Sequence, residues 1–424
     1  MASLIQLPEA RALNSLTPDG RLLFVTRVVR MFAFGFLAVV LVLYLAQQSL
    51  SEKQIGFLLT WTLVGDAAIS LAITFVADRL GRRRMLLIGA GLMIFAGLVL
   101  AWTNSILWLS LAAIIGTLSP GGSEVGAFLS IEQAALPQTT QDEFRTAVFA
   151  WYNLVGSFST ALGALSAGAL ASALVQAGNT TLTSYRVIIA GYALLGVVMF
   201  FLFTRLSDQV EVQKQAGNAP ITQTAPRFGL HRSRAVVLRL ASLFMVDAFA
   251  GGLVLQSVIA YWFHLRFGMD VRLLGEIFFG ANVLAGLSAL AAGRLASKIG
   301  LINTMVWTHI PSNILLILVP LMPNGALAII MLLARFSISQ MDVPTRQSYT
   351  MAVVDPDERA AAAGVTTIAR TIASAFAPTL TGFLFAASFL STPFFIAGGL
   401  KIVYDLLLYR SFSAVKPPEE KKAV

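Results

Sequence analysis

Long apolar runs recur along the chain and are separated by short polar loops. A helix needs ~20 predominantly apolar residues to cross the hydrocarbon core of a bilayer. These runs are continuously apolar, whereas transmembrane β-strands are short and alternate between apolar and polar positions. The pattern therefore predicts an all-α membrane protein with twelve transmembrane helices, at residues 24–47, 54–77, 84–103, 106–135, 144–174, 184–204, 237–263, 274–293, 302–322, 325–350, 357–386 and 391–410.

The composition agrees with a membrane protein and excludes several other classes. The chain is 57% hydrophobic and 12% charged, whereas a soluble domain carries roughly 25% charged residues. It contains no cysteine, and its histidines, His231, His264 and His309, are scattered, which argues against a metal site. No nucleophile and base set and no nucleotide-binding loop can be recognised. We therefore expect neither an enzyme nor a bound cofactor, with a proton gradient as the energy source.

Basic residues concentrate in alternate loops. The formal net charge of +9 would suggest a nucleic-acid partner in a soluble protein. Here it follows the rule that cytoplasmic loops of membrane proteins are rich in lysine and arginine. The basic loops lie near 79–84, 145, 205–239, 294–298, 346–359 and 410–422. We expect both termini to be cytoplasmic, with the lipid bilayer rather than nucleic acid as partner.

The two halves of the chain carry related sequences. The loop Asp78-Arg79-Leu80-Gly81-Arg82-Arg83-Arg84 corresponds to Gly293-Arg294-Leu295-Ala296-Ser297-Lys298-Ile299-Gly300 in the second half. Arg30 and Asp247 are separated by nearly the same number of residues as the two loops are, and so are Glu132 and Arg346. The sequence predicts two six-helix pseudo-repeats, residues 1–205 and 235–424, joined by a cytoplasmic linker at 206–234. Substrate sites of such transporters lie near the bilayer midplane, between the repeats.

With this loop motif and this duplication, the chain resembles the major facilitator superfamily. The family's loop motif reads Gly-x-Leu-Ala-Asp-Arg-x-Gly-Arg-Arg/Lys, and Asp78, Arg79, Gly81, Arg82 and Arg83 match it. Thr74 and Val76 replace its first glycine and its leucine. The second copy has Ser297 in place of the acid. The resemblance covers nearly the whole chain and implies a transporter fold.

The resemblance also implies a cytoplasmic lock. In such a lock an acid at the end of the second helix faces the positive N-terminus of the eleventh, and arginines reach an acid at the end of the fourth. The lock residues are Asp78, Arg79, Gly81, Arg82, Arg83, Glu132 and Arg346. The eleventh helix is predicted to begin at Asp355-Pro356-Asp357-Glu358, with Glu358 in its capping box. The alternative is that Arg82, Arg83 and Arg84 only anchor the loop beside lipid headgroups.

Several polar residues lie inside the predicted spans. A charge at mid-bilayer costs ~2.5–3.5 kcal/mol on insertion scales, so each needs a partner or a function. Our candidates for substrate binding or coupling are Arg30, Asp66, Glu124, Asn153, Asp247, Arg335 and Asp342. In the family, helices 1, 4, 7 and 10 line the central cavity. On the tenth predicted helix Arg335, Ser339, Asp342 and Arg346 are spaced to share one face.

Two chemistries are open for these residues. A buried acid can bind a proton near neutral pH, which makes Glu124, Asp247 or Asp66 a candidate coupling site. A buried guanidinium can hold an anionic substrate through paired hydrogen bonds. Alternatively the charges form structural salt bridges, Arg30 with Asp247 and Arg335 with Glu124, while Lys401 and Asp405 form a local pair on the twelfth helix.

We expect a monomeric, proton-coupled antiporter in a bacterial inner membrane, which exports a small organic solute by alternating access. Export is favoured because the first loop motif is well kept and sugar-porter signatures are missing. In the family, drug-efflux members carry the motif Gly-x-x-x-Gly-Pro. In this chain the stretch that begins at Gly156 lacks the second glycine and the proline of that motif. One alternative is uptake of an organic anion bound by Arg30, Arg335 and Arg370. Another is a membrane sensor or scaffold that transports nothing.

Overall fold

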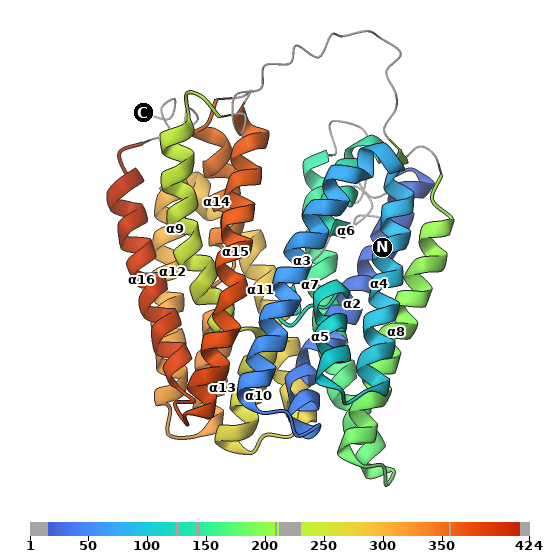
Figure 1. The fold of residues 1–424 in the computed structure, drawn as a ribbon. Helices are drawn as coiled ribbons and strands as arrows, with labels where there is room; N and C mark the ends of the chain where they lie inside the picture. The colour runs from blue at the N-terminus through green and yellow to red at the C-terminus, as the bar shows by residue number, and fades with distance from the viewer. Residues whose placement is uncertain are drawn as a thin grey trace, which may run out of the picture. The chain divides into compact units, whose positions relative to one another are not determined.

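All regular structure in the described part of the chain is helical (Figure 1). The computed structural model describes residues 16–123, 127–140, 145–207, 210–211, 230–355 and 358–415. The first half contains α2 (Pro18–Gln47), α3 (Glu52–Leu80), α4 (Arg82–Trp102), α5 (Ile106–Ile115), α6 (Ala127–Ala135), the 3₁₀ turn η2 (Leu136–Thr139), α7 (Arg145–Gln176) and α8 (Thr181–Thr204). The second half contains α9 (Arg234–Leu253), α10 (Gln256–Phe267), α11 (Val271–Ile299), α12 (Leu301–Leu318), η6 (Val319–Leu321), α13 (Gly325–Phe336), α14 (Asp342–Ala352), α15 (Arg359–Ala386) and α16 (Thr392–Phe412).

Most helices are long enough to cross a membrane. Within the described residues, ten helices combine sufficient length with sufficient apolar character. Two shorter apolar helices, Ile106–Ile115 and Gly325–Phe336, occupy parts of the predicted fourth and tenth spans. The prediction of an all-helical membrane protein is confirmed.

Three spans that the sequence predicts as single helices are each divided into two helices. The run at 106–135 forms α5 and α6, because its centre contains Pro120 and Gly122, which has a positive φ of 63°. The run at 237–263 divides into α9 and α10 at residues 254–255. The run at 325–350 divides into α13 and α14, with turns at 337–341. There the Ser337 hydroxyl donates to the Ala334 carbonyl, competing with the helical backbone. The polar stripe predicted on one tenth helix therefore spans two helices.

The chain divides into two compact units by its internal contacts. The first comprises Met1–Lys214 and Gln256–Val283, and the second comprises Gln215–Leu255 and Leu284–Val424. In the first unit α10 packs against α2, and the Ser257 N–H donates to the Pro120 carbonyl at 3.1 Å. The boundaries 1–205 and 235–424 remain a prediction, and most of the predicted linker at 206–234 lies outside the described residues.

Helices at similar places along the two halves of the chain make similar contacts inside each unit. In the first unit α2 contacts α7 and α8, and α4 contacts α8. In the second unit α9 contacts α15 and α16, and α12 contacts α16. The turns before α4 and α12 also match, because Gly81 and Gly300 adopt positive φ angles of 101° and 87°. Only glycine adopts such angles without strain, so the repeat of glycine in the two loops has a backbone reason.

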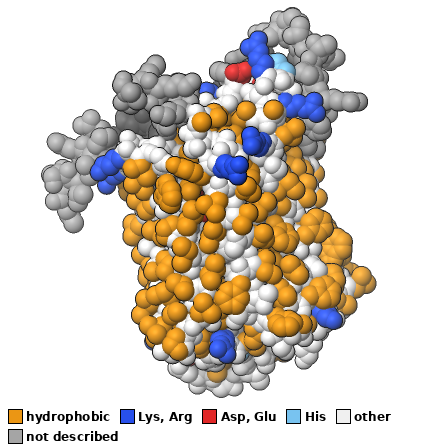
Figure 2. Space-filling view, turned by 90° about the vertical axis from the view of Figure 1, so that its left-hand side faces the viewer, with side chains coloured by type: hydrophobic (Ala, Val, Ile, Leu, Met, Phe, Trp, Pro, Cys, Tyr) orange, Lys and Arg blue, Asp and Glu red, His pale blue; other side chains and the backbone are white. Residues whose placement is uncertain are grey.

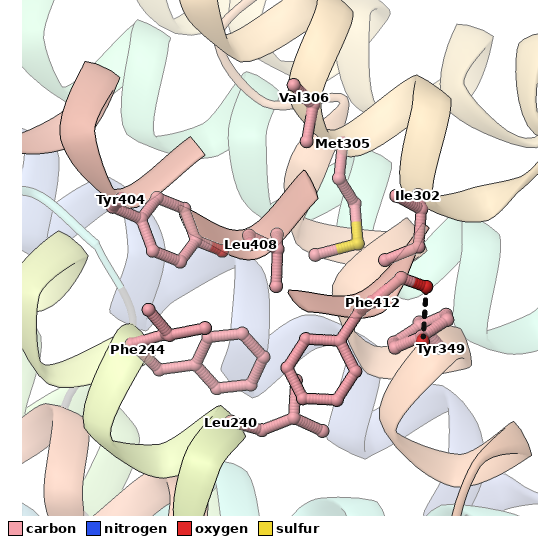
Figure 3. Packing of buried hydrophobic residues seen from close by; sticks show 10 residues of the cluster. Leu240, Phe244, Ile302, Met305, Val306, Tyr349, Tyr404, Leu408 and Phe412 are labelled. Carbon is pink, nitrogen blue, oxygen red and sulfur yellow. Dashed lines mark hydrogen bonds between the residues drawn. The ribbon is translucent and has the colours of Figure 1, made fainter. Parts of the chain in front are cut away.

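Apolar side chains form the core of the second unit and cover its outside. The core cluster joins α9, α12, α14 and α16 through Leu240, Leu243, Phe244, Ile302, Met305, Val306, Tyr349, Tyr404, Leu408 and Phe412 (Figure 3). The Tyr349 hydroxyl donates to the Phe412 and Val415 carbonyls, which ties α14 to the end of α16. On the face shown in Figure 2 hydrophobic side chains cover the middle, and Lys and Arg side chains lie toward its two ends. This distribution suits a surface that faces lipid.

Candidate functional site: a buried ion-pair cluster in each unit

The first cluster is centred on an ion pair between α2 and α6. Arg30 Nη1 and Nη2 each lie 2.6 Å from one carboxylate oxygen of Glu132. Both side chains are 0% exposed. The fork-like geometry gives two parallel charge-assisted hydrogen bonds, the strongest form of such a pair.

Neighbouring polar groups complete this first cluster. The Tyr152 hydroxyl on α7 donates to Glu132, and the Thr26 hydroxyl does so at 3.4 Å. One turn before Arg30, the buried Arg27 donates from Nε to the Tyr152 carbonyl at 2.7 Å, and its guanidinium lies over the Tyr152 ring. The cluster thereby connects α2, α6 and α7.

The second cluster is centred on Asp247 of α9. Its Oδ1 lies 2.5 Å from Lys401 Nζ on α16. Its Oδ2 lies 2.9 Å from Arg370 Nη1 on α15 and 3.3 Å from Arg346 Nη1 on α14. Arg346 also pairs with Asp342 at 2.7 Å. One carboxylate thus accepts contacts from three cations on three helices, so the protein neutralises a buried charge that would otherwise be costly.

A histidine extends the second cluster. His309 Nδ1 on α12 lies 2.9 Å from Asp405 Oδ1 on α16, and its Nε2 lies 3.9 Å from Asp247 Oδ1. The Asn313 side-chain amide donates to Asp405 at 3.2 Å. His309, Asp247 and Asp405 are all buried. An imidazole between two carboxylates can bind and release a proton.

Arg335, at the end of α13, differs from the other intramembrane cations. Its Nε is buried and has no hydrogen-bond partner within the described residues. Its guanidinium lies 5.1 Å from the Phe336 ring centroid. The buried Ser339 hydroxyl, in the break before α14, likewise lacks a partner within that part of the chain. A buried guanidinium with an N–H that has no hydrogen-bond partner there is a candidate ligand for an anionic group.

The structure gives other partners to the residues of two predicted pairings. Arg30 and Asp247 each have ion-pair partners inside their own unit. Lys401 and Asp405 do not form a local pair, because Lys401 binds Asp247 and Asp405 binds His309. Sequence spacing placed Lys401 and Asp405 one helical turn apart, but the neighbouring helices offer each of them a closer partner.

Glu132, a predicted residue of the cytoplasmic lock, has a different partner from the one expected. Within the described residues its ion-pair partner is Arg30, not Arg82 or Arg83. The first-turn amides of α4 instead donate to the Glu211 carboxylate, Arg82 N at 2.6 Å and Arg83 N at 3.1 Å. This acid follows α8 and stabilises the positive end of α4. Arg346, also assigned to the lock, lies in the Asp247 cluster.

Other predicted residues are placed less completely. The side chains of Asp78 and Arg79 and the whole of Glu124 lie outside the described residues, so their assigned roles, and a pairing of Arg335 with Glu124, stay predictions. Asp66 is half-buried on α3. Asn153 is exposed on α7 and accepts a hydrogen bond from Arg27 Nη2 at 3.4 Å.

Glu358 caps a different helix from the one expected. It occupies the N-cap position of α15 but makes no side-chain bond there. Its carboxylate accepts from the backbone amides of His231, Arg232 and Ser233 at the start of α9, at 2.7, 2.7 and 2.8 Å. Burial alone would raise the pKa of Glu358, but these three donors outweigh it and lower the pKa to about 2. The His231 ring also contacts this carboxylate.

Sequence reasoning missed several cluster members. His309 was set aside because the histidines are scattered, and Arg27 was not singled out although it lies one turn from Arg30. A periodicity check would have found Arg27, since residues three apart share a helix face. No sequence signal links His309 to Asp405. Among the described residues no group of three or more His, Asp or Glu side chains could hold a metal ion.

Comparison with known proteins identifies the family. A model of the Major Facilitator Superfamily matches residues 23–378, most of the chain. The chain belongs to the Major Facilitator Superfamily. It is therefore a multi-pass integral membrane protein and a transporter rather than an enzyme.

One curated relative has a similar length. The uncharacterized membrane protein YJR124C of Saccharomyces cerevisiae is 30% identical over 430 residues, which covers 95% of this chain and 96% of the yeast protein. The high coverage on both sides indicates that the two proteins share their architecture from end to end.

Solved structures share the superfamily fold at low sequence identity. The nucleoside transporter NupG has a TM-score of 0.71 at 13% identity, covering 93% of this chain and 99% of NupG. The xylose transporter XylE from E. coli has a TM-score of 0.69 at 16% identity, covering 95% and 98%. The human organic anion transporter MFSD10 has a TM-score of 0.63 at 16% identity, covering 92% and 100%. At these identities the likeness establishes the fold alone.

Proposed function

We propose that this protein is a proton-coupled secondary transporter that moves a small organic solute by alternating access. The observation that carries the proposal is the pair of buried clusters around Arg30–Glu132 and Asp247–Arg346. Buried ionisable groups inside a membrane are costly and mark substrate or proton pathways. A D-xylose–proton symporter among the solved structures of similar fold supports proton coupling. A sensor or scaffold has no need for these clusters.

The proposal includes an architecture of twelve spans in two parallel pseudo-repeats. Matching helix contacts in the two units support it, as do the matching glycines Gly81 and Gly300. The basic loops support the further proposal that both termini are cytoplasmic. We propose export by antiport, on the basis of the well-kept loop motif, and a monomer in a bacterial inner membrane.

Flux measurements test the proposed function. A thermal-shift screen of the purified protein against organic acids, bases, sugars and amphiphilic drugs selects compounds that stabilise it. Each selected compound is then loaded into proteoliposomes, and its movement is followed with and without a pH gradient. We expect gradient-dependent movement of at least one compound, absent from protein-free liposomes. Stabilisation without any flux would support the sensor or scaffold instead.

A second candidate function is transport of an organic anion, including its uptake. The specific observation that favours it is Arg335, whose Nε is buried and without a partner among the described residues. Arg370, which is 29% exposed, offers a second accessible cation within the same unit. The human organic anion transporter of similar fold agrees with this candidate. The break between α13 and α14 at residues 337–341 also supports transport of an organic anion, since interrupted helices form substrate sites in transporters.

A further inference from the structure

His309 is the one histidine in the described residues that lies between two buried acids. Its Nδ1 faces Asp405 at 2.9 Å and 3.1 Å, the two oxygens of that carboxylate. Its Nε2 faces Asp247 Oδ1 at 3.9 Å, beyond hydrogen-bond distance. With Nδ1 donating to Asp405, the neutral ring keeps the lone pair of Nε2 directed at the Asp247 side.

Charged groups surround His309 from each helix packed around it. On α16 these are Lys401 and Asp405, and on α9 Asp247. The ring of Tyr404, also on α16, contacts the His309 ring. Behind Asp247 lie Arg346 and Asp342 of α14 and Arg370 of α15. Arg335 of α13 has no ion pair in the described residues.

With His309 neutral, three carboxylates of this cluster are each matched by one of three cations. The carboxylates of Asp247, Asp342 and Asp405 are matched by the cations Lys401, Arg346 and Arg370. A proton on His309 adds a cation beside Asp247 Oδ1, the oxygen that Lys401 already contacts at 2.5 Å. Protonated His309 and Lys401 therefore compete for one oxygen, while the arginines keep the other.

We propose that His309 is the proton-carrying residue of the transport cycle, with Asp405 as its positioning residue. The inference rests on the proposed proton-coupled function. In this step Nε2 of the neutral imidazole accepts a proton from a hydronium ion, which leaves a water molecule, and the new N–H turns toward Asp247 and weakens the bond from Lys401. Loss of the proton to water on the other side restores the bond. Protonation thus loosens a contact between α9 and α16, which couples the proton to helix movement.

Asp247 is less suited to carry the proton itself. It contacts Lys401, Arg370 and Arg346, so protonating it would remove the acid that these three cations share. His309 changes charge while the carboxylates stay paired. Imidazole is also the side chain whose ordinary titration falls near neutral pH.

The chain contains three histidines, which makes a direct test practical. His231→Gln and His264→Gln together leave His309 alone to carry isotope-labelled histidine, and its ring nitrogens are followed by NMR in lipid nanodiscs. We expect the His309 ring to be observed in both its protonated and its neutral form as the pH is varied. In Asp405→Asn the neutral ring should no longer be held with its proton on Nδ1, because the carboxylate that accepts from Nδ1 is gone. A ring that stays neutral throughout, or an unchanged tautomer in Asp405→Asn, overturns the proposal.

Flux in proteoliposomes tests the coupling role with a compound that the wild type moves. His309→Gln should abolish pH-gradient-driven accumulation and retain exchange of the compound across the membrane. His264→Gln is the matched control, because His264 Nδ1 lies 2.8 Å from the Met269 carbonyl and the ring pairs with no acid among the described residues. If His309→Gln does not fold, Asp405→Asn, which keeps the imidazole, replaces it and should reduce accumulation. Accumulation at the wild-type rate overturns the role of His309. If the wild type moves no compound, the proposed function fails and this role fails with it, although the His309 titration is still measured.

Discussion

Arg30 and Glu132 form a bidentate, fully buried ion pair, and their equivalents in the second half, Asp247 and Arg346, pair with the charges exchanged. The Arg30–Glu132 contacts are 2.6 Å long and the Arg346–Asp247 contact is 3.3 Å long. Each half thus joins its first and fourth predicted spans through one acid and one arginine. Exchanging both signs keeps the pair neutral, which is what burial requires. The second half adds Lys401 and Arg370 around its acid.

Glu132→Ala should destabilise the protein strongly, because it leaves Arg30 buried without its partner. We expect a loss of about 3–5 kcal/mol in the free energy of unfolding, measured by denaturant titration in detergent micelles. Glu276→Ala is the control, since it breaks an exposed pair with Arg272 that is worth about 0–1 kcal/mol. Equal effects of the two substitutions would show that the buried pair contributes no more than a surface pair.

Exchanging the charges of the first pair should recover part of that loss. Arg30→Asp with Glu132→Arg copies the arrangement of Asp247 and Arg346. We expect the double variant to unfold at higher denaturant than either single variant, because neither charge is then unpaired. If the double variant instead loses as much stability as the two single variants together, the neighbouring Tyr152 and Thr26 tolerate only the native placement of the two charges.

Asp247→Asn should be more damaging than Asp342→Asn. Asp247 contacts three cations, whereas Asp342 pairs with Arg346 alone. Removing the shared acid should cost about 3–5 kcal/mol, and removing Asp342 less, because Arg346 keeps its contact with Asp247. Thermal unfolding of the two variants side by side measures the difference. The reverse order would contradict the central position of Asp247.

Gly81→Ala and Gly300→Ala should each destabilise the turn before α4 and α12. Their φ angles of 101° and 87° are disfavoured for a residue with a side chain, at a cost of about 1–3 kcal/mol. The control is Gly91→Ala in α4, where an added methyl group meets no atom within 4 Å. That control should be neutral or stabilising by about 0.5–1 kcal/mol, because alanine favours the helix. Equal melting temperatures for all three variants would exclude strain at these turns.

The contribution of Glu358 to stability should depend on pH. Its folded-state pKa of about 2 lies below the ordinary value of a glutamate, about 4.3. The stabilisation by the ionised carboxylate is therefore complete above the ordinary value and is lost as the pH falls toward 2. Glu358→Gln should have a lower melting temperature than the wild type at neutral pH, and this gap in melting temperature should narrow in acid. A gap that stays constant down to about pH 3 would contradict the low pKa. Glu276→Gln, on an exposed side chain, is the control.

Arg335 should be dispensable for stability but required for anion binding. Arg335→Ala breaks no ion pair among the described residues, so its melting temperature should stay near that of the wild type. Organic carboxylates and phosphates that stabilise the wild type should fail to stabilise Arg335→Ala. Arg335→Lys should bind them roughly tenfold more weakly, because lysine lacks the planar fork. Unchanged stabilisation of both variants would rule out Arg335 as the anion ligand, and Arg272→Ala, at an exposed arginine, controls for net charge.

Much of the architecture followed from the sequence by itself. The apolar runs determined the helical membrane fold, because a segment of that length and composition has no other stable state in lipid. The loop pattern around Gly81 and Gly300 pointed to the duplication and the family, and the backbone angles explain why both positions are glycine. The intramembrane charges of Arg30, Asp247 and Arg335 were visible as candidates, because a charge in an apolar run needs a reason.

Only the tertiary structure decided which residues meet. It paired Arg30 with Glu132, Lys401 with Asp247 and His309 with Asp405, and it directed Glu358 to the start of α9 rather than to its own helix. It also divided the predicted tenth span into α13 and α14. Sequence patterns report burial and helical period, which are local properties. The partner of a buried charge depends on how distant helices pack, and on which neighbour offers the nearest group of opposite charge.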